Sequence, residues 1–182
     1  MSTTMAPPLR KFALIVHLVA SVGWIGAVAA YLALDVTAVA SQDVQLVRAA
    51  YLTMELTVLW VIVPLALASF LTGLVMALGT PWGLFRHYWV LISLLLTILT
   101  TAVLLIEVGT IRDLARVAAS GADPRGLPGT LLHSIGGLAV LLVITVLNVY
   151  KPRGVTPYGW RRQQEERRRR EARGFRAPPR AG

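Results

Sequence analysis

The sequence contains no cysteine. This absence excludes a disulfide framework, a cysteine-ligated metal site, a CxxCH attachment motif and a thiol nucleophile. Charged residues are also scarce, at 15% of the 182 residues, whereas they make up about a quarter of an average soluble domain. Because 55% of the residues are hydrophobic, the composition further excludes an ordinary soluble enzyme and a disordered chain.

Four long stretches of the sequence carry no charge, and they cover residues 12–34, 56–85, 88–106 and 126–150. A helix needs about 20 apolar residues to cross about 30 Å of hydrocarbon. Backbone groups in lipid must be hydrogen-bonded internally, which favours helices packed as a bundle. We therefore predict an all-α fold, a four-transmembrane-helix bundle within residues 12–150. The predicted spans are about 12–34, 56–78, 88–107 and 130–150; residues 1–11 form the N-terminal segment and 151–182 a basic tail.

A cleavable signal peptide is the alternative reading of the first stretch. Arg10 and Lys11 precede it, and Ala38-Val39-Ala40 offers a small-residue cleavage site. The apolar run is 23 residues long, whereas the core of a signal peptide has about 7–15. The length favours a membrane span.

The basic residues are distributed unevenly between the two sides of this predicted bundle. The side with both termini and the 79–87 turn holds 14 of the 18 lysines and arginines, and the other side holds Arg48, Arg112, Arg116 and Arg125. The positive-inside rule then predicts a multi-pass protein of a bacterial inner membrane with both termini in the cytoplasm. On the outer side, Thr110 to Asp113 resembles a capping box and Gly121 resembles a helix end, so we expect a short amphipathic surface helix between spans three and four.

Eleven basic residues lie between Lys151 and Arg180. A polybasic segment directly after a membrane span predicts contact with anionic lipid headgroups. Charge alone would also allow nucleic-acid binding, but the tail has no stacking pattern of aromatic residues, so we do not expect it. The lipid bilayer is the predicted partner, and a homo-oligomer is a further possibility.

One stripe of the first span combines a histidine with aromatic and polar residues. His17, Ser21, Trp24, Tyr31 and Asp35 recur at helical spacing. Ionisable groups inside a membrane are costly and are therefore functional candidates. Neutral imidazole suits haem iron, copper or zinc. The alternative for His17 is a hydrogen bond to a neighbouring helix.

A second histidine, His87, begins the third span near the same predicted side as His17. The two imidazoles could converge on one ligand, with Trp24 packed against it. Alternatively, His87 lies at the level of the lipid headgroups as an interfacial residue.

The opposite, outer end offers another group of ionisable residues. Glu55 begins span two, Glu107 ends span three and His133 begins span four. Two carboxylates and an imidazole at similar depth could bind a metal cation or relay protons. Alternatively, the glutamates reach toward the surface and His133 caps its helix.

Several short motifs resemble those of known families of membrane proteins. They are His17 with Trp24 and Gly26, the run 64–69, the run 79–89 and the run 150–154. With these motifs the chain, over residues 10–158, resembles a family of bacterial predicted integral membrane proteins of unknown function. The pattern is also distantly similar to the copper-resistance D inner-membrane family and to the membrane protoporphyrinogen oxidase family.

The resemblance implies that His17 corresponds to a shared first-span histidine and Trp24 to its companion. The oxidase family has a lysine in its third span, and Ser93 stands at that position here. We therefore do not expect protoporphyrinogen oxidase activity, and we assign no catalytic residue.

Three functions follow as hypotheses. The first is a membrane protein that binds haem b or copper through His17, with His87 or an unassigned group opposite, for electron transfer, sensing or cofactor handling. The second is a structural or accessory membrane protein without chemistry. The third is a small ion or proton transporter that uses Glu55, Glu107 and His133.

Overall fold

The structure is a computed structural model that describes residues 5–79 and 84–175. Residues 80–83 of the predicted 79–87 turn lie outside the described residues. The first four residues of the N-terminal segment and the last seven of the basic tail also lie outside them.

The described chain is all-helical. Its elements are α1 (Pro7–Ala40), α2 (Val44–Thr57), the π-helical turn η1 (Val58–Ile62), α3 (Val63–Gly79), α4 (Tyr88–Ala119), α5 (Leu131–Tyr150) and α6 (Pro157–Phe175). Between the described residues, the one extended pairing is an isolated bridge from His87 to Val155.

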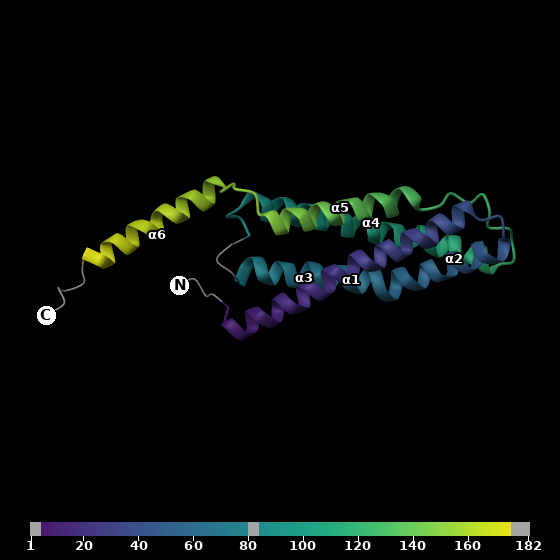
Figure 1. Ribbon diagram of the computed structural model, residues 1–182, viewed down its shortest axis with the longest axis horizontal. Coiled ribbons are helices and arrows are strands. Elements are labelled where there is room, and N and C mark those ends of the chain that lie inside the picture. The colour runs from purple at the N-terminus through teal and green to yellow at the C-terminus, as the bar shows by residue number, and fades with distance from the viewer. Residues whose placement is uncertain (1–4, 80–83, 176–182) are drawn as a thin grey trace.

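Four helices are long and apolar enough to cross a membrane: α1, the continuous helix Val44–Gly79, α4 and α5. They pack as an elongated bundle, and α6 projects from one end of it (Figure 1). The start of α1 and the whole of α6 lie at that same end of the bundle (Figure 1). The prediction of a four-helix membrane bundle is confirmed at this level.

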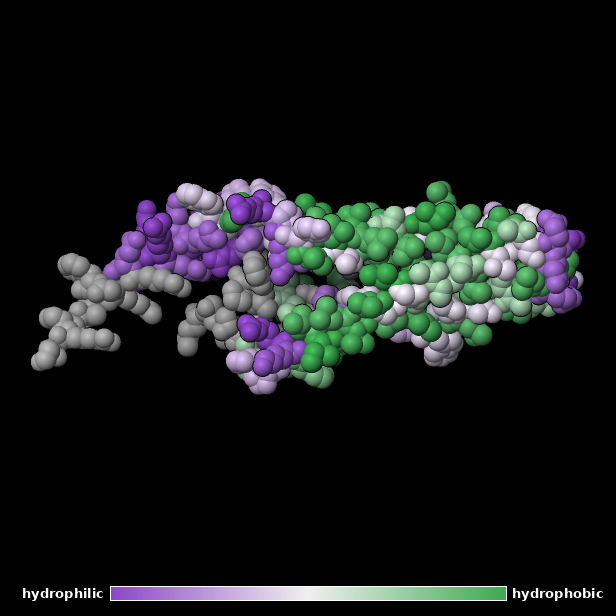
Figure 2. Space-filling model, viewed as in Figure 1, coloured by the Kyte–Doolittle hydropathy of each residue, from purple (hydrophilic) through white to green (hydrophobic). Residues whose placement is uncertain are grey.

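The outer surface of the bundle is apolar along most of its length. Large side chains such as Val19, Trp60, Ile106 and Leu132 are more than two-thirds exposed. Figure 2 shows a hydrophobic belt over the helices, bounded by hydrophilic residues at each end. Soluble monomers rarely expose apolar patches beyond a few hundred Å². The chain is therefore an integral membrane protein whose exposed surface faces lipid.

The helix that runs from α2 into α3 contains a π-helical turn directly before a proline. The backbone N–H of Val63 donates to the carbonyl of Val58, which closes a wider turn than an α-helix has. Pro64 lacks an N–H and its ring would clash with the carbonyl four residues before it. The wider turn accommodates the proline without ending the helix.

The surface helix expected between spans three and four is not a separate element. Residues 110–119 continue α4 without a break. No proline interrupts the helix, and its buried residues Ile111, Leu114 and Ala118 join the same core as α2. The helix ends at Ala119, two residues before Gly121, which adopts φ +87°, a conformation that glycine allows at little cost. The amphipathic pattern therefore marks the end of a long helix.

The helix α1 is central, because it packs against α2, α3 and α5. Its buried residues follow helical spacing and include Trp24, Tyr31 and Asp35. His17 and Ser21 are partly buried on the same stripe. The predicted stripe therefore faces the bundle interior and places polar groups at both ends of α1.

Candidate functional sites

The imidazole of His17 contacts α3. Its Nδ1 lies 3.1 Å from the carbonyl oxygen of Ser69 and 3.1 Å from Oγ1 of Thr72. One turn farther along α1, Oγ of Ser21 lies 2.8 Å from Oγ of Ser69. These polar contacts join α1 to α3 in the half of the bundle that carries α6.

The hydrogen bonds around His17 select one tautomer. The Thr72 hydroxyl donates to the carbonyl of Ala68 at 2.6 Å. The Thr72 oxygen can therefore only accept a hydrogen bond from Nδ1. The Ser69 carbonyl can also only accept one. Nδ1 must carry the proton, which leaves the lone pair on Nε2. Within the described residues, Nε2 has no hydrogen-bond partner.

A glycine makes room for the imidazole. A Cβ at position 73 would stand 3.1 Å from Cε1 of His17 and 3.9 Å from Nε2. Any other residue at position 73 would crowd the ring. The sequence analysis missed this role of Gly73, because the contact joins residues 56 positions apart and only packing reveals it.

His17 lines a pocket of about 620 Å³ between α1, α3, α4 and α5. The walls are mostly apolar and include Phe70, Leu74 and Trp89. Arg10 and Lys151 line the pocket at helix ends, and Met76 is also a lining residue. For comparison, ligand pockets measure about 300–1,000 Å³. We call this space the His17 pocket.

His87 does not line the His17 pocket. It precedes α4 in extended conformation, pairs with Val155 near α6, and its ring centroid lies 6.3 Å from that of Trp89. The structure thus brings Trp24, but not His87, to the pocket. A shared ligand for His17 and His87 stays a prediction.

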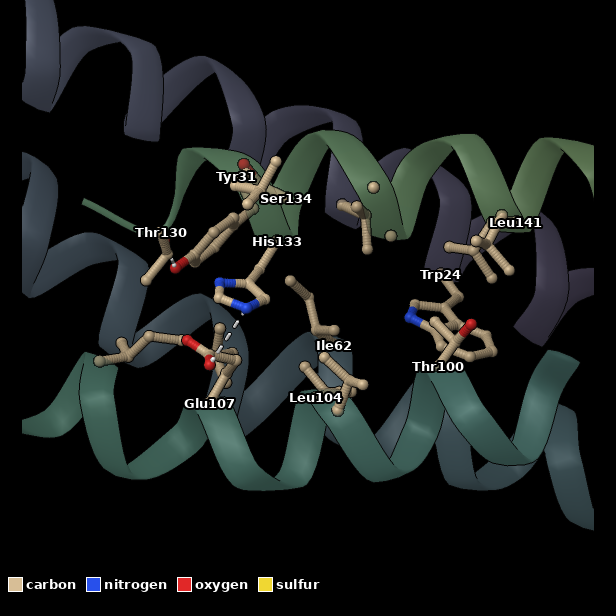
Figure 3. A pocket seen from close by; sticks show the side chains of 18 of the residues that line it. Trp24, Tyr31, Ile62, Thr100, Leu104, Glu107, Thr130, His133, Ser134 and Leu141 are labelled. Carbon is tan, nitrogen blue, oxygen red and sulfur yellow. Dashed lines mark hydrogen bonds and ion pairs between the residues drawn. The ribbon is translucent and has the colours of Figure 1, made fainter. Parts of the chain in front are cut away.

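The second pocket lies in the other half of the bundle, between α1, η1, α4 and α5, and measures about 230 Å³. Nε2 of His133 lies 3.6 Å from Oε1 of Glu107 at one end of it. Figure 3 shows this pair beside Tyr31 at one end, and Thr100 and Trp24 at the other, with Leu104 between. We call this space the Glu107 pocket.

Glu55 is not a lining residue of the Glu107 pocket. Among the described residues, no three histidine, aspartate or glutamate side chains lie close enough to hold a metal ion together. Of the predicted trio, the structure therefore brings Glu107 and His133 together without Glu55.

A buried hydrogen-bond network adjoins the Glu107 pocket. Asp35 is fully buried, and its Oδ2 accepts hydrogen bonds from Thr130 Oγ1 at 2.9 Å and from Ser134 Oγ at 2.8 Å. The Thr130 hydroxyl gives its proton to Asp35, so Tyr31 must donate to Thr130 across their 2.8 Å contact. The network ties the end of α1 to the start of α5.

Sequence reasoning placed Asp35 on the α1 stripe but gave it no role. It missed Thr130 and Ser134. Their spacing of four residues at the start of the fourth span was a usable signal, because it puts both hydroxyls on one helix face.

Trp24 and Leu141 line both pockets. Trp24 is only 3% exposed, so its indole forms part of the wall between them. The sequence analysis singled out Trp24 as a companion of His17, and the structure adds that it also borders the Glu107 pocket.

No family model matches the sequence, and neither a curated protein nor a solved structure matches it.

Proposed function

We propose that the protein binds haem b in the His17 pocket, where His17 would hold the iron. The observation that carries this proposal is the hydrogen-bonding of His17. Nδ1 donates to a backbone carbonyl, and Nε2 keeps its lone pair beside a large apolar space. Metal-ligating histidines have this arrangement, in which the second nitrogen orients the ring and raises its basicity.

The pocket suits the shape and charge of a haem. Its volume and apolar walls fit a large, flat, hydrophobic molecule. Arg10 at the start of α1 and Lys151 at the end of α5 provide positive charge at one end of the pocket. Cationic side chains at that end would pair with the carboxylates of the propionates.

The residues of the chain supply binding and orientation. Ser69 and Thr72 hold the His17 ring, Gly73 leaves space beside it, and Trp24 forms part of the pocket wall. When bound, haem supplies one-electron redox chemistry. This assigns the protein a role in membrane electron transfer, redox sensing or haem handling.

Copper is a weaker fit to the same site. A copper ion is held by several soft or imidazole ligands in close contact. Met76 is the one further soft side chain among the lining residues of the His17 pocket. A single ion would leave most of that volume unfilled, whereas haem would occupy it.

The test is an absorption spectrum of the purified full-length protein, oxidised and reduced, produced in haem-replete cells. We expect a Soret band that shifts on reduction and is lost in His17→Ala. His133→Ala is the matched control, because it removes a membrane histidine outside the pocket and should keep the band. A colourless wild-type protein contradicts the proposal, and so does a His17→Ala variant with an unchanged spectrum.

We also propose that the end of the bundle with α6 faces the cytoplasm of a bacterial cell and that α6 contacts anionic lipid. The support is the excess of basic residues at that end. Because the chain has no cysteine, single cysteines can be introduced without background. In intact cells, Ser120→Cys should react with an impermeant thiol reagent and Gln164→Cys should not; the reverse pattern contradicts this orientation.

A further inference from the structure

We propose that the Glu107 pocket binds a membrane-soluble hydroquinone, with one hydroxyl of its ring between Glu107 and His133. This site is separate from the proposed haem site and requires no haem.

The Glu107 carboxylate receives no hydrogen bond from the described residues. Oε1 of Glu107 faces His133 at 3.6 Å, which is longer than a hydrogen bond. Oε2 is buried and has no partner within the described residues. A buried acceptor without a donor is energetically unfavourable. A ligand hydroxyl can donate to Glu107 and accept from His133, and so satisfies both side chains.

The pocket opens toward lipid. Leu99 and Leu132 line it and are 58% and 81% exposed on the apolar surface of the bundle. Gly136 and Gly137 also line it, and a Cβ at either position would meet nothing within 4 Å. Because no side chain projects there, a molecule dissolved in the bilayer can enter from the side.

A second hydroxyl would find a polar partner deeper in the pocket. Thr100 lines the pocket two turns before Glu107 on the same helix, about 10.5 Å away at 1.5 Å per residue. That spacing is comparable to a para-hydroquinone with one hydrogen bond at each end. Trp24 lies beside Thr100 (Figure 3), where its indole can pack against the ring.

The size and charge of the pocket exclude other lipids. Its 230 Å³ is just below the range for drug-sized ligands, which suits a single substituted ring. Fatty acids and phospholipids would bring negative charge next to Glu107. A neutral hydroquinone ring fits the volume of the pocket and brings no negative charge next to Glu107.

The test uses durohydroquinone under anaerobic conditions with the full-length protein in lipid nanodiscs. A ligand that binds only the folded state raises the thermal unfolding midpoint, and the rise grows with the ratio of free ligand concentration to Kd. We expect durohydroquinone to raise the midpoint. Its dimethyl ether, which has the same ring without an O–H, should not. An equal shift from the ether overturns the proposal, as does the lack of any shift with durohydroquinone.

Two pairs of matched variants locate the site. Glu107→Gln should weaken binding at least tenfold, whereas Glu55→Gln, the same change outside the pocket, should alter it less than twofold. Gly137→Leu fills the pocket mouth, and Gly109→Leu adds the same side chain at an open position elsewhere. Only Gly137→Leu should block binding. The proposal is overturned if the two members of each pair bind durohydroquinone equally well. If Glu107→Gln fails to fold, the comparison of Gly137→Leu with Gly109→Leu decides between the outcomes.

The experiment also separates this site from the proposed haem site. His17→Ala should lose the Soret band and keep the response to durohydroquinone. A colourless wild-type protein that still responds would refute haem binding and leave the hydroquinone site standing. A coloured wild-type protein that does not respond to durohydroquinone would refute the hydroquinone site and leave haem binding standing.

Discussion

The two ends of α1 hold two different kinds of polar site. At the His17 end, one imidazole is held by a carbonyl and a hydroxyl beside a space of about 620 Å³. At the Asp35 end, a carboxylate and three hydroxyls bond to one another beside a space of about 230 Å³. The first end has a large space with polar groups spread along its walls, and the second has a small space beside a compact, buried hydrogen-bond network.

The comparison shows that the same bundle can use polar groups to join its helices at one end and to leave a binding site at the other. Polar groups inside a membrane are costly unless they are paired. At the Asp35 end the pairing joins α1 to α5 directly and so contributes to packing. At the His17 end, Nε2 of the ring keeps its lone pair. A bound ligand would satisfy that nitrogen.

The largest effect is expected from Asp35→Ala. The change removes the acceptor for Thr130 and Ser134, and leaving buried hydroxyls without an acceptor should cost about 2–3 kcal/mol of unfolding free energy. Reversible unfolding in detergent measures the loss. Asp43→Ala is the matched control, because it removes only the exposed cap of α2, worth about 1 kcal/mol. Equal losses would show that the Asp35 network does not hold the helices together.

The next effect is expected from Gly73→Ala at the His17 end. The new Cβ would stand 3.1 Å from Cε1 of His17 and push the ring by a few tenths of an ångström. We expect haem affinity to fall about tenfold, which corresponds to about 1.4 kcal/mol, with little change in the stability of the haem-free protein. Haem titration measures it. Gly26→Ala, at an open position of α1, should leave affinity unchanged, and a similar loss there would argue against a ring-specific effect.

A smaller effect is expected where α6 joins the bundle. The hydroxyl of Thr156 donates to the carbonyl of Phe85 at 2.5 Å and accepts from the N–H of Gly159. Thr156→Val should remove about 1 kcal/mol of local stability and speed tryptic cleavage of α6 several-fold. Thr145→Val is the control, because its hydroxyl bonds only within α5. Equal cleavage rates in both variants would contradict this role for Thr156.

The smallest effect concerns pH at the opposite end of the bundle. The side chain of Arg125 hydrogen-bonds Asp123 and lowers the pKa of that carboxyl to about 2, from 3.8. Because this pKa is lower in the folded state, the ionised carboxyl stabilises the fold fully above pH 3.8. This stabilisation is lost as pH falls from 3.8 toward 2. The pair is exposed, so the effect should be small and weakened by salt.

Comparing the unfolding midpoint of the wild type with Asp123→Asn checks this effect. The difference should shrink as pH falls through that window. A difference that grows would reverse the sign of the contribution.

The prediction from sequence was strongest where one physical requirement dominates. Crossing a membrane demands a long uncharged run, so the four apolar helices could be located from composition alone. Their ends were harder to locate. The residues after Glu107 look amphipathic, yet they continue α4 because they pack on α2. Local pattern cannot distinguish a packed helix end from a separate surface helix.

The sequence by itself determined that this is a helical membrane protein and that His17, Trp24, Glu107 and His133 are its unusual intramembrane residues. Only the tertiary structure decided which of them meet. Contacts such as His17 with Gly73, or Asp35 with Thr130, join residues more than fifty positions apart. They depend on the rotation and depth of each helix in the bundle, which packing between helices sets and no single helix encodes.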